Sequence, residues 1–185
     1  MAIVSLKNKT KSGELLVGNT PPGRGFQLLA STTVGSGGAA TITFSSIPSD
    51  YTHLQIRGIY DSVFQADNTL RFNSDSGSNY SWHSVYGQGS SVTAINSVNS
   101  TNCYFGYTAN VASVNGCVID ILDYKNTNKY KTIRALAGYD ANGSGFIFFS
   151  SGSWRNTNAI TTITLHSDTN FTQYSHFALY GILGV

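Results

Sequence analysis

Apolar and polar residues alternate most clearly in Phe44-Ser-Ser-Ile-Pro-Ser-Asp-Tyr-Thr-His-Leu-Gln-Ile-Arg57, and the pattern returns in Phe171-Thr-Gln-Tyr-Ser-His-Phe-Ala-Leu-Tyr-Gly-Ile182. Such a period of two residues is typical of a β-strand with one buried face. A proline turn precedes the first strand pattern, and an Asn-containing loop precedes the second. We predict that the following apolar side chains of these strands lie in the core: Leu54, Ile56, Phe177 and Leu179.

Strand patterns continue from Phe26 to the end of the chain at roughly 8 to 12 residues apart, which is the spacing of an all-β sandwich or barrel. The chain has a single Glu, Glu14, and only 11% charged residues, so it offers few helix-forming surface residues. We therefore predict an all-β, jelly-roll-like β-sandwich. Its predicted strands are 26–34, 39–46, 53–60, 69–73, 80–87, 103–109, 116–124, 129–138, 145–151, 159–166 and 175–182.

Two segments between these strands are predicted to lack regular structure. Residues 88–102 have low complexity and no clear apolar face, so we predict a long surface loop there. The stretch Asp140-Ala-Asn-Gly-Ser-Gly145 opens like a calcium-binding loop but has Ser151 where a closing acid is needed. A plain turn is therefore favoured for residues 140–145.

Further short stretches carry a resemblance to a known family. Together with the two stretches above, they resemble a β-sandwich found in structural proteins of tailed bacteriophages. The resemblance spans residues 26 to 182 and implies a jelly roll on the surface of a virion, as in capsid decoration or fibre-type proteins. The matching stretches are Leu70-Arg-Phe-Asn73, Asn79-Tyr-Ser-Trp82, Ile119-Asp-Ile-Leu-Asp-Tyr124 and Ser153-Trp-Arg-Asn-Thr-Asn-Ala-Ile160.

Residues 1–25 differ from the rest of the chain, which is slightly acidic. They carry four basic residues against one acid, then a short apolar run, then a Gly- and Pro-rich stretch that neither a helix nor a central strand can cross. We predict an extended N-terminal anchoring arm and linker over residues 1–25, followed by one β-sandwich domain over residues 26–185. The predicted anchoring residues are Lys7, Lys9, Lys11, Leu15, Leu16, Val17 and Arg24. A frayed terminus is the alternative.

Composition sets the expected surroundings. The chain has 41% hydrophobic residues and a net charge of +2, which argues against disorder and against a general nucleic-acid binder. Neither a signal peptide nor an apolar run of membrane-spanning length is evident, so we expect assembly in the host cytoplasm and no membrane partner. A reducing cytoplasm favours free cysteines. We predict Cys117 to be a small buried residue, and a Cys103–Cys117 bridge is the less favoured alternative.

Residues suited to catalysis are few. The histidines His53, His83, His166 and His176 form no pair with metal-ligand spacing, and paired carboxylates are nearly absent. We therefore predict a protein that is not an enzyme and needs no metal or cofactor. A polysaccharide depolymerase with acids from distant strands is the third functional hypothesis.

One basic cluster and one aromatic group are candidates for ligand binding. Lys125, Lys129, Lys131 and Arg134 flank a predicted hairpin, and we interpret them as a solvated sheet edge that discourages strand pairing. An aromatic group could stack on a sugar while polar neighbours bond its hydroxyls, although Trp82 is also a good core residue. The candidate glycan-binding residues are Tyr80, Trp82, His83, Tyr86, Trp154, Arg155 and Asn156.

Within the virion setting, two functions compete. The first is capsid decoration, in which the arm docks on the major capsid protein and the domain forms a homotrimer. The second is adhesion to a host-surface glycan from the tail or a head fibre. We favour decoration, because receptor-binding fibres usually need a long shaft. Low surface charge and many Tyr and Phe residues are typical of interfaces, which supports self-association.

Overall fold

The computed structural model describes residues 25–109 and 114–184, and the described part is all β. It contains no helix that is long and apolar enough to cross a membrane. The predicted anchoring arm lies outside the described residues, apart from Gly25. The strands are β1 (Phe26–Thr33), β2 (Ala39–Phe44), β3 (His53–Tyr60), β4 (Ala66–Phe72), β5 (Tyr80–Gln88), β6 (Ser91–Ser100), β7 (Cys103–Thr108), β8 (Asn115–Leu122), β9 (Lys131–Ala141), β10 (Ser144–Trp154), β11 (Ile163–Phe171) and β12 (His176–Ile182).

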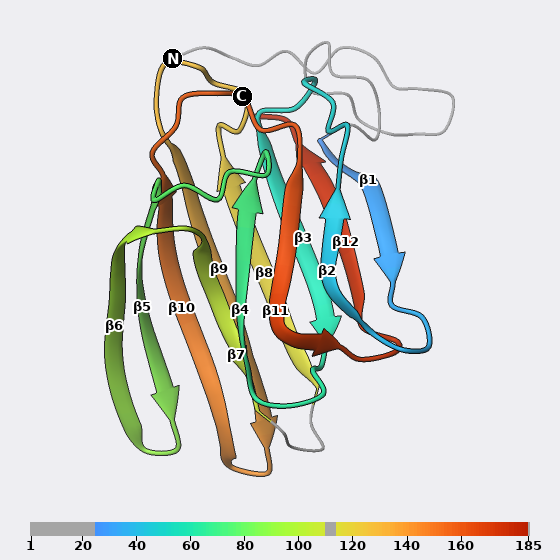
Figure 1. Cartoon of the computed structure of the whole chain (residues 1–185), viewed down its shortest axis with the longest axis vertical. Helices are drawn as coiled ribbons and strands as arrows, with labels where there is room; N and C mark the ends of the chain where they lie inside the picture. The colour runs from blue at the N-terminus through green and yellow to red at the C-terminus, as the bar shows by residue number, and fades with distance from the viewer. Residues whose placement is uncertain (1–24, 110–113, 185) are drawn as a thin grey trace, which may run out of the picture.

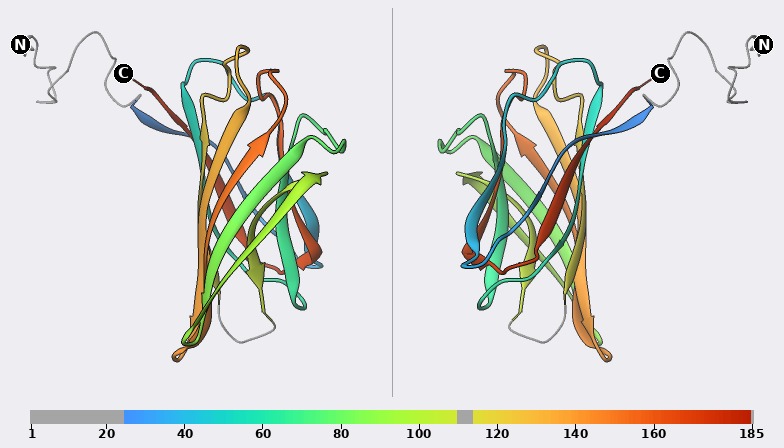
Figure 2. Two further views of the ribbon diagram at one scale, coloured as in Figure 1. Left: turned by 90° about the vertical axis from the view of Figure 1, so that its left-hand side faces the viewer. Right: turned by 90° about the vertical axis from the view of Figure 1, so that its right-hand side faces the viewer.

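These strands form two antiparallel sheets that pack face to face. The large sheet has eight strands in the order β1-β12-β3-β8-β9-β10-β5-β6, and the small sheet has four in the order β2-β11-β4-β7. Figure 1 shows the small sheet in front of the large one, and Figure 2 shows the two layers from the side. Because the small sheet has half as many strands, it covers only part of the inner face of the large sheet.

The chain passes repeatedly from one sheet to the other. It places β2 in the small sheet, β3 in the large, β4 in the small, β5 and β6 in the large, and β7 in the small. It then forms the β8-β9-β10 meander in the large sheet before β11 and β12 return to the small and large sheets. Sequential strands that alternate between two antiparallel sheets give the predicted jelly-roll-like β-sandwich.

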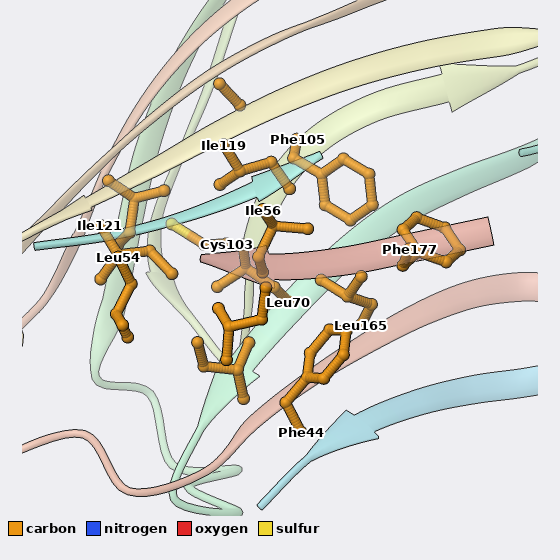
Figure 3. Packing of buried hydrophobic residues seen from close by; sticks show 14 of the residues in the cluster. Phe44, Leu54, Ile56, Leu70, Cys103, Phe105, Ile119, Ile121, Leu165 and Phe177 are labelled. Carbon is orange, nitrogen blue, oxygen red and sulfur yellow. The ribbon is translucent and has the colours of Figure 1, made fainter. Parts of the chain in front are cut away.

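Side chains from both sheets fill the space between them. The four apolar residues predicted for the core, Leu54, Ile56, Phe177 and Leu179, are at most 1% exposed. Figure 3 shows three of them packed with residues of β2, β4, β7, β8 and β11. The alternation in β3 and β12 therefore identified the buried face correctly, because each strand places every second side chain on the core.

The strand and turn predictions are largely confirmed. Every predicted strand corresponds to an observed one, and the turn predicted at residues 140–145 connects β9 to β10. Asn142 and Gly143 both have positive φ, which is typical of a two-residue hairpin turn. The backbone N–H of Gly143 donates to Asp140 Oδ1 at 3.2 Å.

The predicted long loop over residues 88–102 is wrong. Ser91–Ser100 form β6, an edge strand of the large sheet that pairs with β5 alone. Most of its side chains are exposed, so its position depends on backbone hydrogen bonds rather than on a buried apolar face. An exposed edge strand needs no alternation of apolar residues, and the sequence pattern therefore gave no strand signal there.

The interpretation of the basic cluster is also wrong. β8 and β9 lie in the interior of the large sheet, so Lys129 and Lys131 do not protect an edge. The Lys131 side chain is fully buried, and its ammonium group donates to the carbonyl oxygens of Lys129 and Thr157 at 3.1 and 3.0 Å and to that of Asn126. Lys129 forms an ion pair with Asp123. These lysines hold the β8–β9 connection together.

The two cysteines are free and buried. Cys117 is 5% exposed and faces the core of the sandwich from β8, as predicted for a small buried residue. Burial raises the pKa of each thiol to about 12, which keeps both thiols protonated and unreactive.

Candidate functional site: the outer face of the large sheet

The outer faces of the two sheets differ sharply in polarity. Across the small sheet, Thr43 lies beside Thr164 and Thr164 beside Arg71, while the next row contains Thr41, His166 and Thr69. This face is the polar surface expected of a sheet in contact with water. The outer face of the large sheet is different, because apolar residues and glycines occupy much of its centre.

The centre of that outer face is organised into three straight rows across β8, β9, β10, β5 and β6. In each row, the residues are direct cross-strand neighbours, since the four strand pairs share one register. We call them the apolar row, the glycine row and the polar row. The apolar row is Val118, Leu136, Phe149, Val85 and Ala94; the glycine row is Gly116, Gly138, Ile147, Gly87 and Val92; the polar row is Asp120, Arg134, Ser151, His83 and Asn96.

Large apolar side chains on this face are in contact with water. Phe149 is 54% exposed, Ile147 is 59% and Leu136 is 48%, and Ile59 extends the glycine row onto β3 with 63% exposure. Scattered exposed apolar residues are normal, but a contiguous apolar patch on a monomer marks an interaction site. The difference between the two sheets makes this patch a specific feature of the large sheet.

The glycine row makes the face hollow. A shallow depression of about 930 Å³ lies over Ile59, Gly116, Leu136, Gly138 and Ile147. A Cβ atom added to Gly116 would meet nothing within 4 Å, so this position is open. Glycines within strands are typical of places where another group approaches the backbone closely.

Gly138 has a second role. A Cβ atom there would lie 2.3 Å from the Phe146 carbonyl oxygen and 3.0 Å from Ile147 Cα of the neighbouring strand. The backbones of β9 and β10 therefore approach each other too closely for any larger residue. Gly138 allows this approach, whereas Gly116 leaves space above the sheet.

A charged and aromatic group borders the face on its β1 side. The Arg57 guanidinium lies over the rings of Phe26 and Tyr180, 5.1 and 5.8 Å from their centroids, and the two rings stack on each other. Arg57 Nε also donates to Gln55 Oε1 at 2.8 Å, and Gln55 in turn donates to Asp120 Oδ1 at 2.8 Å. Charge is thus concentrated around the apolar and glycine rows rather than on them.

The predicted glycan-binding residues do not form one site. Tyr80 and Trp154 are fully buried in the core, and Trp154 Nε1 donates to Asp75 Oδ2 at 2.7 Å. Burial opposes ionisation of Asp75, but hydrogen bonds from Trp154, Asn79 and Gly77 outweigh it and lower the pKa of this carboxyl. Because they are buried, Tyr80 and Trp154 are not accessible to a ligand. His83 belongs to the polar row, on the opposite side of the sheet from Tyr80.

The other candidates are divided between two places. Arg155 Nη2 donates to the Ser78 carbonyl at 2.6 Å and to Asn99 Oδ1 at 2.7 Å, and Asn156 follows it in the loop after β10. Trp82 and Tyr86 lie on the inner face of the large sheet, beside the edge strand β7. There they join a set of neighbouring rings that we call the aromatic cluster: Trp82, Tyr86, Tyr104, Tyr107, Tyr139, Phe146 and Phe148.

The aromatic cluster is partly accessible, because β5 extends beyond the small sheet. Trp82 stacks on Tyr104 with ring centroids 5.0 Å apart, and both Trp82 and Tyr86 are half-buried. Trp82 Nε1 is buried and has no hydrogen-bond partner among the residues that the structure describes. Burial raises the pKa of the Tyr104 hydroxyl, and the nearby Asp67 carboxylate raises it further, so this hydroxyl stays protonated.

Within residues 25–109 and 114–184, no group of three or more His, Cys, Asp or Glu side chains could hold a metal ion. When the chain is compared with known proteins, it matches no family model, no curated protein and no solved structure.

Sequence reasoning missed the outer face of the large sheet. A signal was present in three short runs that are apolar at consecutive positions: Cys117-Val-Ile119, Ala135-Leu-Ala137 and Phe146-Ile-Phe-Phe149. Consecutive apolar residues in a strand place apolar groups on both of its faces. The three runs indicate apolar positions on the outer face, but only the strand order shows that they lie side by side.

Proposed function

We propose that this chain is a non-enzymatic structural protein of a tailed-phage virion, assembled in the host cytoplasm and displayed on the particle as a capsid-decoration protein. The observation that carries the proposal is the apolar and glycine-lined outer face of the large sheet, which contrasts with the polar outer face of the small sheet. Such a face is suited to a permanent contact with another protein, because burying apolar surface is the main favourable term in protein association.

Two further features support this role. The resemblance of residues 26–182 to phage structural proteins supplies the virion setting. In addition, β1 begins at Phe26, which pairs with Ile182 at the edge of the large sheet, and the Gly25 carbonyl accepts a hydrogen bond from Leu183 N at 3.1 Å. Gly25, the residue that follows the predicted arm segment 1–24, thus lies at one edge of the large sheet.

Virion incorporation tests this proposal. Phage lacking the gene is complemented with the full chain or with a chain shortened by residues 1–24, which retains Gly25. We expect the full chain on the heads of purified particles by electron microscopy, and at least a tenfold lower copy number for the shortened chain by quantitative mass spectrometry. A circular dichroism spectrum of the shortened chain controls for folding.

Three results would contradict parts of the proposal. Purified particles that never contain the full chain would exclude a virion role. Normal incorporation of the shortened chain would exclude anchoring by the arm, while location on the tail would favour adhesion over decoration.

The aromatic cluster favours a second function, adhesion to a host glycan. The partly exposed rings of Trp82 and Tyr86 offer flat apolar surfaces on which a sugar ring can stack. We expect Tyr86→Ala to weaken binding to host-surface polysaccharide about tenfold, whereas His83→Ala, on the other face of β5, leaves it unchanged. Calorimetric titration of both variants would show equal affinities if the cluster binds no glycan.

A further inference from the structure

We infer that the outer face of the large sheet binds the same face of a second copy of this chain, about a two-fold axis that runs across the strands between the apolar row and the glycine row. The inference concerns the isolated protein and extends the proposed structural role by naming the contact between copies. The two sheets would lie aligned, since sheets with the same twist pack with nearly parallel strand axes.

Size complementarity between the two rows supports this axis. Rotation about this axis places each residue of the apolar row over the glycine-row residue of the same strand in the second copy. Val118 then faces Gly116, Leu136 faces Gly138, and Val85 faces Gly87. On the remaining two strands, Phe149 faces Ile147 and Ala94 faces Val92, so that three large side chains of the apolar row meet glycines while Phe149 and Ile147 meet each other. The depression over the glycine row is filled by the second copy.

Charge complementarity points to the same axis. On β9, the axis passes between Leu136 and Gly138, so it relates Arg134 on one side to Asp140 on the other. Arg134 of each copy therefore faces Asp140 of the other at both ends of the contact. Asp140 Oδ1 already accepts from Gly143 N, but a carboxylate has about four acceptor sites and can accept an additional charged donor.

The size of the face suits a stable pair. Its strands from β12 to β6 present on the order of 25 outward positions, which is within the roughly 20–30 residues per side of a standard protein interface. A second copy is favoured over an unrelated partner because both the large side chains and the matching glycines lie on this one face. Such an isologous contact joins two copies, in contrast to the homotrimer expected from composition.

Gly116→Leu provides a direct test. Its added Cβ has open space within the monomer, but the leucine side chain would overlap Val118 of the second copy. Gly35→Leu is the matched control, because Gly35 also has nothing within 4 Å and lies in the β1–β2 loop, away from the face. Sedimentation of the full chain from roughly 1 to 100 µM covers the micromolar affinity that corresponds to about 8 kcal/mol.

We expect the wild type and Gly35→Leu to form a pair of identical mass, and Gly116→Leu to raise the dissociation constant by roughly 100-fold. Adding Val118→Ala to Gly116→Leu should recover at least tenfold of the lost affinity, because the smaller side chain makes room for the leucine on both sides of the axis. Leu136→Asp is a second disruptive variant if Gly116→Leu proves misfolded by circular dichroism.

Several outcomes would overturn the inference. They are a wild-type chain that stays monomeric up to roughly 100 µM, a trimer mass, or unchanged association in both Gly116→Leu and Leu136→Asp. Disruption without recovery by Val118→Ala would exclude the assigned axis. The sedimentation experiment uses no phage particles. A result that overturns the pairing of copies therefore does not decide the proposed virion role, which the incorporation experiment tests.

Discussion

Phe177→Ala is expected to lower the free energy of unfolding by ~3 to 5 kcal/mol, the usual cost of removing a buried phenylalanine ring. Phe177 is fully buried in β12, and its ring packs on Tyr60 and Phe171 with centroids 5.4 and 5.1 Å apart. The ring also covers Gly58, where an added Cβ would lie 2.6 Å from it. No side chain at Gly58 can fill the resulting cavity, so little relaxation is expected.

Chemical denaturation followed by circular dichroism measures this loss. Phe64→Ala is the matched control, since Phe64 is 62% exposed in the loop after β3 and loses few contacts on truncation. We expect the control to change the unfolding free energy by less than ~0.5 kcal/mol. Similar losses in the two variants would mean that the buried face of β12 is wrongly assigned.

Gly138→Ala is expected to destabilise the protein by roughly 2 to 3 kcal/mol, although it adds a single methyl group. The methyl carbon would lie 2.3 Å from the Phe146 carbonyl oxygen, which is backbone and cannot rotate away. The β9–β10 hairpin would have to move apart, and its hydrogen bonds would weaken. This cost comes from the close approach of two strands.

Gly116→Ala is the control for that substitution. Gly116 is the cross-strand neighbour of Gly138 in the glycine row, but a methyl group there meets nothing within 4 Å. We expect Gly116→Ala to stabilise the fold by about 0.4 to 1 kcal/mol, because alanine reduces the conformational freedom of the unfolded chain. Thermal and chemical unfolding of both variants should give opposite signs, and two equal changes would contradict the geometry of the hairpin.

The two variants also separate stability from association. Gly138 and Gly116 both lie in the proposed contact between copies. Only Gly138 is also needed within one chain, because it allows the backbones of β9 and β10 to approach each other closely. A loss of stability in Gly138→Ala therefore has its origin within one chain. By contrast, Gly116→Leu is expected to change association while leaving the unfolding of the single chain nearly unaffected.

Local patterns were sufficient to predict most strands, the hairpin turn at residues 140–145 and the buried positions of β3 and β12. These features depend on a period of two residues and on turn chemistry, which operate between residues close in sequence. β6 escaped prediction because an exposed edge strand needs no apolar alternation. Lys131 was misread for a related reason, since the carbonyls that surround its ammonium group include Thr157 from a distant loop.

The candidate site is formed only by the tertiary structure. Val118, Leu136, Phe149 and Val85 belong to four different strands that are far apart in the sequence, and Gly116 and Gly138 look like ordinary strand glycines. They become an apolar row beside a glycine row only because the strand order β8-β9-β10-β5 and a common register bring them together. Sequence alone was enough for an all-β sandwich with its core residues, because burial acts on each strand separately. The surface suited to a second copy arises between strands, because cross-strand neighbours are set by pairing and not by distance along the chain.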